Sequence, residues 1–237
     1  MYKNESMKEE DLINNRAHLT KLLLDKSALK QDISDDCEKV FASFKNAISK
    51  ELDALKLNIK DPRIRLSYED KGMHEIHVYI GSDVLVFNLH RNIFRMPDND
   101  PLWGTAYFRA DENHGYFGII NIFNFLAESF LQHRINDTGY LIGRIFINKE
   151  RHFYIEGKGH LGSLFRDTQN SLLNDDVIAA IIQLAFAYAL QFDLHIPPYE
   201  YFSEISVEQI QLMGESLKLQ TGKRLGFKMK SDESENS

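Results

Sequence analysis

Residues 139–158, GYLIGRIFINKERHFYIEGK, have the pattern of a β-hairpin. β-Branched and aromatic residues fill two arms, Gly139–Ile147 and His152–Lys158, and the polar run Asn148–Arg151 between them predicts a turn. The first arm is apolar on both faces, which is typical of a central strand in a sheet that is covered on both sides. The hairpin therefore predicts an antiparallel sheet as the centre of the fold.

The most apolar stretch follows at residues 176–192, DVIAAIIQLAFAYALQF. It leaves almost no polar stripe, so we predict a helix that is buried nearly all round, with Asn174 or Asp175 as its N-cap. The apolar run is shorter than the about 20 residues that a membrane span requires, and Gln183 interrupts it. We therefore expect a core helix that covers the sheet, and no membrane segment.

Two earlier segments supply the rest of the predicted core. In residues 34–59, with Ser34 as a candidate N-cap, apolar side chains recur at steps of three and four, which indicates an amphipathic helix lying on a sheet. Residues 63–89 instead alternate between apolar and polar, with glycine turns at Gly72 and Gly81. This alternation predicts an antiparallel meander of three strands.

The pattern between the meander and the hairpin is mixed. Residues 91–103 contain two prolines and predict a loop, and Thr105–Ala110 predicts a fourth strand. Helical spacing returns over residues 118–134, although Tyr116–Ile122 would also fit a strand. The expected fold is an α+β domain with the order α-β-β-β-(β)-α-β-β-α and helical extensions at both ends.

Composition divides the 237-residue chain into four predicted parts. These are an N-terminal helical extension, an α+β core domain, a C-terminal helix with a short strand packed on the core, and a disordered acidic tail, at residues 1–33, 34–194, 195–230 and 231–237. The single cysteine, Cys37, lies on an apolar stripe and fits a reducing compartment, and the N-terminus lacks the apolar core of a signal peptide. We therefore expect a cytoplasmic protein.

Charge and histidine spacing argue against two classes of function. A net charge of -7 does not suit a surface-wide nucleic-acid footprint, and the basic cluster between Lys218 and Lys230 fits a solvated face. The nine histidines lack the spacing of a metal site. His74 and His90 could face each other across neighbouring strands, but two ligands without a third make a weak site. We expect no metal and no cofactor.

Gly157–Gly162 matches the GxGxxG pattern of dinucleotide-binding sites. That motif requires a parallel βαβ unit, whereas the strand before it is the second arm of a hairpin and hence antiparallel. We therefore interpret these glycines as an exit of the chain from the edge of the sheet.

Glu156 and Lys158 match half of the motif of a family of metal-dependent nucleases, with Asp137 as the partner acid. That chemistry needs two carboxylates on one Mg²⁺ and a lysine near the attacking water. The predicted hairpin register places Gly143 opposite Glu156, and Asp137 then lies about 13 Å beyond the level of Lys158 along the strand. We interpret Glu156 and Lys158 as a surface charge pair and keep a nuclease, which would bind nucleic acid, as the alternative.

The order of elements across residues 34–192 resembles the fold of type III secretion chaperones and YbjN-like proteins. The residues that carry this resemblance are Asn121–Asn124 at the start of the middle helix, the hairpin Gly139–Lys158 and the closing helix Asp176–Phe192. The resemblance is topological and covers about two thirds of the chain. It implies a non-enzymatic protein-binding module, chaperone- or adaptor-like, that is often dimeric.

The residues themselves agree with a binding role, because the core is well patterned and no catalytic constellation is visible. Trp103, Tyr107 and Phe108 follow the proline-containing loop and gather aromatic side chains, which are common anchors in protein interfaces. Core packing is an equal alternative for these three. We expect a protein partner, and we take Trp103, Tyr107 and Phe108 as the candidate partner-binding residues.

Overall fold

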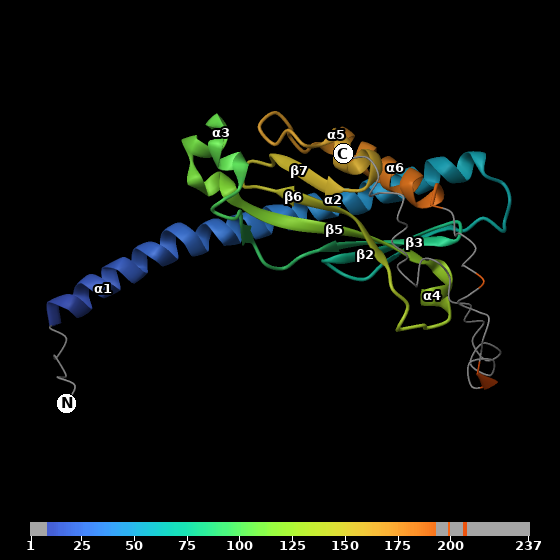
Figure 1. Cartoon of the computed structure of the whole chain (residues 1–237), viewed down its shortest axis with the longest axis horizontal. Coiled ribbons are helices and arrows are strands. Elements are labelled where there is room, and N and C mark those ends of the chain that lie inside the picture. The colour runs from blue at the N-terminus through green and yellow to red at the C-terminus, as the bar shows by residue number, and fades with distance from the viewer. Residues whose placement is uncertain (1–8, 193–198, 200–205, 208–237) are drawn as a thin grey trace.

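The computed structural model describes residues 9–192, 199 and 206–207 of the chain. The described residues form a seven-stranded antiparallel sheet packed with helices, so the predicted α+β class is confirmed (Figure 1). Within these residues, none of the helices combines the length and the apolar character that crossing a membrane requires. The C-terminal helix, strand and tail predicted beyond residue 194, and the basic cluster among them, lie outside the described residues.

One continuous helical segment forms the N-terminal part of the structure. It consists of α1 (Glu9–Leu22), a π-helical turn (Leu23–Ser27) and α2 (Ala28–Asn58). The helix start predicted at Ser34 is therefore wrong, because the backbone is already helical before this residue and offers no free amide groups for a serine to cap.

The sheet contains the predicted meander and the predicted hairpin. All its strand pairs are antiparallel, and in space the strands follow the order β1-β2-β3-β5-β6-β7, with the short β4 paired to β5. The strands are β1 (Leu66–Asp70), β2 (Glu75–Ile80), β3 (Asp83–Leu89), β4 (Phe94–Arg95), β5 (Tyr116–Leu126), β6 (Tyr140–Ile147) and β7 (Phe153–Gly157).

Strand β5 occupies the centre of the sheet. The helix predicted over residues 118–134 from helical spacing is therefore wrong for most of its length. The strand pairs with β3 on one side and with β6 on the other, and only the short α4 (Ala127–Leu131) follows it. Both faces of β5 are apolar, with Ile120 packed on one side and Phe117 on the other. A strand that is apolar on both faces also places apolar residues three and four apart, so spacing could not exclude a helix. Asn121–Asn124, which carried part of the family resemblance, therefore lie in a strand.

The fourth strand predicted at Thr105–Ala110 is also wrong. The side chains of Asp100 and Asp111 each accept a hydrogen bond from the backbone N–H two residues further on, which favours turns and helix starts over an extended strand. Three short helices result: η2 (Pro101–Gly104), α3 (Ala106–Ala110) and η3 (Glu112–Gly115).

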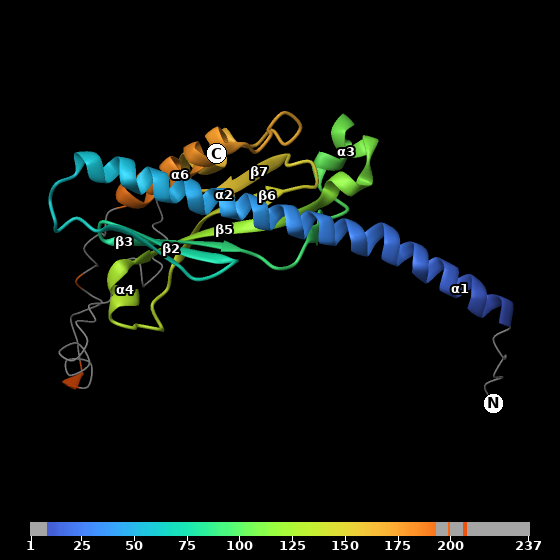
Figure 2. The ribbon, with the colours of Figure 1, turned by 180° about the vertical axis from the view of Figure 1, so that it is seen from behind.

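Helices α2 and α6 (Asp175–Leu190) share one hydrophobic core with one face of the sheet, and Figure 2 shows α2 crossing the sheet. The Asn174 side chain accepts a hydrogen bond from the Val177 amide at 3.0 Å, so this predicted N-cap is confirmed. The prediction that α6 is buried nearly all round is wrong, because Gln183 and Leu190 are exposed on its outer side. Nothing in the described part of the chain forms a further layer over α6.

Helix α2 lies very close to β5 where Cys37 meets Gly118. A Cβ atom at Gly118 would lie 2.3 Å from the Cys37 Sγ, so only glycine allows this approach. Cys37 is buried, and burial raises the pKa of its thiol to about 12, as expected for a core residue.

Gly118→Ala should lower the free energy of unfolding by about 1–3 kcal/mol, because the added methyl group overpacks this contact. Cys37→Ala in the same chain should recover part of the loss, so a double-mutant cycle measured by urea denaturation should give a coupling of about 1 kcal/mol. Gly104→Ala is the control, because nothing lies within 4 Å of the Cβ that it adds. Fully additive effects of the Gly118 and Cys37 substitutions would contradict this packing.

Candidate functional site

The hairpin that carries Glu156 pairs one residue away from the predicted register. Ile147 lies opposite Phe153, because Arg151 takes a left-handed conformation with φ of 61° and the Asn148 amide bonds to the His152 carbonyl at 3.0 Å. The prediction that Gly143 faces Glu156 is therefore wrong. Glu156 lies opposite Arg144 and forms an ion pair with it.

The other two residues of the nuclease alternative have separate surroundings. Asp137 accepts a hydrogen bond from the Ser129 hydroxyl at 2.8 Å, and its Oδ2 lies 3.4 Å from Arg134 Nε. Lys158 follows β7 with an exposed side chain. Among the described residues, no group of three or more histidine, cysteine or acidic side chains could hold a metal ion.

The glycine motif serves packing between β7 and the short helix α5 (Gly159–Leu164). A Cβ atom at Gly162 would lie 2.1 Å from the carbonyl oxygen of Gly157, so the two backbones touch. Gly159 has a left-handed φ of 54°, which suits a residue without a side chain. The motif thus turns the chain at the edge strand of an antiparallel sheet.

Trp103, Tyr107 and Phe108 belong to a cover that η2, α3 and η3 form over one end of the second sheet face. Phe108 is 1% exposed and is therefore a core residue of this cover rather than an interface anchor. Trp103 is half-buried over Gly115, and its indole N–H donates to the Pro97 carbonyl at 2.9 Å. Core packing thus explains most of this aromatic group.

Tyr107 lies between two histidine rings. Its ring stacks on His114 at 4.0 Å and on His152 at 4.5 Å between centroids, one on each face because two rings cannot stack on the same face. Its hydroxyl donates to Glu150 at 2.8 Å and accepts from the Asn148 side chain at 2.8 Å. Burial raises the pKa of Tyr107, and the hydrogen bond from the Tyr107 hydroxyl lowers the pKa of Glu150. Tyr107 therefore fastens the cover to the β6–β7 turn.

A row of polar residues crosses the second sheet face between two apolar clusters. The clusters lie under the cover at one end and beside α4 at the other. Most charges in the row are paired within it or nearby, since Arg144 bonds to Glu156, and Glu75 bonds to Asn88 and His77. The row consists, in register, of Glu75, Asn88, Asn121, Arg144 and Glu156.

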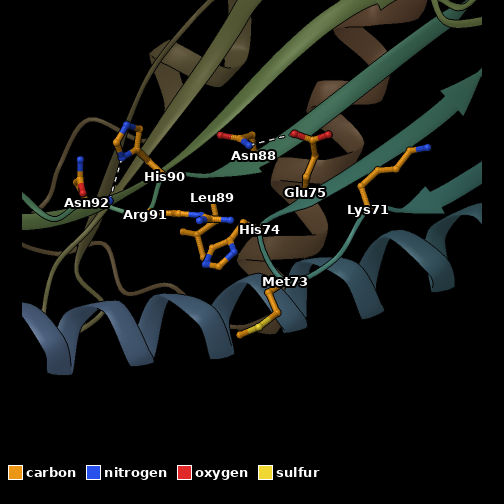
Figure 3. A pocket seen from close by; sticks show the side chains of 9 residues that line it. All are labelled: Lys71, Met73, His74, Glu75, Asn88, Leu89, His90, Arg91 and Asn92. Carbon is orange, nitrogen blue, oxygen red and sulfur yellow. Dashed lines mark hydrogen bonds between the residues drawn. The ribbon is translucent and has the colours of Figure 1, made fainter.

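An open pocket of about 590 Å³ adjoins this row at the ends of β2 and β3 (Figure 3). His74 and His90 both line it, but Leu89 rather than His90 is the backbone neighbour of His74, so the two histidines do not face each other directly. In Figure 3 Lys71, Met73 and His90 point in different directions. These three side chains therefore do not converge on one point of the pocket. The pocket is lined by Lys71, Met73, His74, Glu75, Asn88, Leu89, His90, Arg91 and Asn92.

The projecting helix, which we define as residues 12–27, is the most unusual surface of the described structure. Figures 1 and 2 show α1 extending beyond one end of the sheet, clear of the other elements. Every residue from Leu12 to Ser27 except Leu22 is exposed, although several are large and apolar. The exposed ones are Leu12, Ile13, Leu19, Leu23 and Leu24. The leucines were visible in the sequence, but their exposure depends on where the sheet ends.

Glu156→Ala and Lys158→Ala should fold normally, with unfolding free energies within about half a kcal/mol of wild type, because both side chains are exposed. Adding Mg²⁺ should change the melting temperatures of wild type and of Glu156→Ala by the same amount. An ion that does not bind at Glu156 cannot stabilise the folded protein through this residue. Arg144→Ala is the control that leaves Glu156 without its ion-pair partner. A Mg²⁺ stabilisation that Glu156→Ala abolishes would restore the nuclease alternative.

Tyr107→Phe should cost about 1 kcal/mol of unfolding free energy at neutral pH, because it removes the hydroxyl between Glu150 and the buried Asn148. The pKa of Glu150 is lowered in the folded state, so this stabilisation is present above its ordinary value of 4.5 and is lost as the pH falls through the lowered pKa. The cost should therefore be smaller at an acidic pH, below 4.5, than at neutral pH. Tyr154→Phe, in the same cluster, is the control. Equal costs at both pH values would contradict the assigned bond.

The surfaces of the described chain thus comprise a paired polar row, an open pocket with diverging side chains and a helix with exposed leucines. No protein-family model matches the chain, and neither a curated protein nor a solved structure is significantly similar to it.

Proposed function

We propose that this chain is a non-enzymatic protein-binding module, chaperone- or adaptor-like, that holds its partner through the projecting helix. The observation that carries the proposal is the stripe of Leu12, Leu19 and Leu23, which are 40%, 57% and 63% exposed. Steps of seven and four residues place these three side chains on one face of the helix.

Energetics support a partner for this helix. The projecting helix continues the helical segment of α2, and the main contacts of α1 are with the π-helical turn that follows it, so its leucines gain little from packing on the body. Burying one leucine side chain contributes about 1.5–3 kcal/mol, so covering three of them would stabilise the helix well beyond its own propensity. The helix thus has the properties of an element that gains further stability on binding.

The partner must offer an apolar surface that accepts a helix. His18, Lys21 and Asp25 form the opposite, polar face of the projecting helix and stay in water. A helix with one apolar face and one polar face binds by laying the apolar face into a groove or against another helix. The function therefore depends on three leucines that do not stabilise the body of the protein.

Leu19→Asp combined with Leu23→Asp should abolish capture of partner proteins by the tagged chain, measured by affinity purification and mass spectrometry. The thermal unfolding of the body should stay within about half a kcal/mol of wild type, because these side chains are exposed. In wild type, partner binding should slow hydrogen exchange of the amides in residues 12–27.

His18→Asp combined with Lys21→Asp is the matched control, since it places the same two acids on the polar face of the same helix. This control should capture the same proteins as wild type. The proposal fails if the Leu19 and Leu23 double variant retains the full set of captured proteins, or if exchange in residues 12–27 does not change on binding.

A further inference from the structure

We infer that the partner of the projecting helix is a second copy of this chain, bound antiparallel through the same helix. The inference rests on the proposed function, because it names the occupant of the leucine stripe. It follows from the order of residues on that face and from the way the helix leaves the body.

The apolar face has a central stripe and two uncharged flanks. The central positions recur at steps of four, three and four, which keeps them in one line along the helix. Arg16 is the one charged residue among them. The stripe is Leu12, Arg16, Leu19 and Leu23, and its flanks are Ile13 with Thr20 on one side and Asn15 with Leu22 on the other.

An antiparallel pair with its two-fold axis between Ala17 and His18 matches this stripe to itself. Leu12 then packs against the partner's Leu23, and Arg16 lies beside the partner's Leu19, with its charged end free to reach water. Each contact occurs twice because the interface is isologous. On the flanks, Ile13 meets the partner's Thr20, and no two like charges oppose each other.

A parallel pair of the same helices is disfavoured on two grounds. It would set Arg16 against the partner's Arg16 in the centre of the stripe, where like charges repel. It would also bring two sheet domains together at one end, whereas the antiparallel pair places them at opposite ends of the paired helices (Figure 1). The antiparallel arrangement avoids both the repulsion between arginines and the crowding of the two sheet domains.

The uncharged flanks favour a second copy over a different protein. In paired helices, charges at the flanking positions select the partner and its orientation. Here the described flanks carry no charges, so the flanks of two identical copies do not repel each other. The partner needs no complementary charges at these positions. The polar side chains His18, Lys21 and Asp25 lie on the far side from the stripe.

The size of the contact sets the expected affinity. The overlap runs from Glu9 to Lys26 of each copy, which is about 27 Å of helix, and it ends within the π-helical turn. An interface of this length lies near the lower limit of stable interfaces, about 1,200 Å² in total. We therefore expect a reversible dimer with a Kd in the micromolar range.

Sedimentation equilibrium of the full chain tests the inference. Between about 1 and 300 µM the mass of wild type should rise from the 27.5 kDa monomer toward twice that value. Leu19→Asp with Leu23→Asp should stay monomeric, and His18→Asp with Lys21→Asp should behave as wild type. Arg16→Leu should lower the Kd about tenfold, because it completes the apolar stripe.

A spin label at Lys26→Cys reports the orientation, since Cys37 is buried and does not compete for the label. Labels on the two copies should lie about 25 Å or more apart in the antiparallel pair, against about 10–15 Å in a parallel pair. A short distance, a wild type that is monomeric throughout, or an unaffected Leu19 and Leu23 double variant would each overturn the inference. Wild type could be monomeric while the Leu19 and Leu23 double variant still loses the captured proteins. This result would overturn only the inference that the partner is a second copy, and the proposed function would stand.

Discussion

The contact between Cys37 on α2 and Gly118 on β5 governs the rest of this structure. It lets α2 lie directly on the central strand, and α2 in turn packs along α6, so that one helix joins both halves of the main core. Because α1 and α2 form one continuous helical segment, the same contact also fixes the direction in which the projecting helix leaves the body. Core packing thus sets the geometry of the surface to which we assign binding.

Much of the fold could be predicted from local patterns. The meander and the hairpin follow from alternation and from the glycines of their turns, and α6 follows from its apolar run and its Asn174 cap. Strand β5 could not be distinguished from a helix, because both of its faces are buried and Ile120 and Phe117 satisfy either period. Residues 105–110 became helical because aspartates that hydrogen-bond to the nearby backbone initiated turns on both sides of them.

The candidate sites depended on details that the sequence does not encode locally. A left-handed Arg151 shifts the hairpin by one residue and so gives Glu156 an arginine partner. The stacking of Tyr107 between His114 and His152 joins residues up to 45 positions apart, and no spacing rule predicts such a contact. The leucines of the projecting helix could be counted in advance. Their importance became visible only when the sheet proved to end before it reached them.

The π-helical turn at Leu23–Ser27 gives this architecture an unusual evolutionary freedom. Such a turn holds one residue more than regular α-helix, and here it contains Leu23 of the stripe and joins α1 to α2, which packs in the core. Deleting one residue within it, beyond Leu23, would convert it to regular α-helix, which covers nearly the same arc with one residue fewer, so α2 would keep its contacts and the leucine face its direction. A change of a single codon could therefore shorten this segment without redirecting the projecting helix or disturbing the interior of the protein.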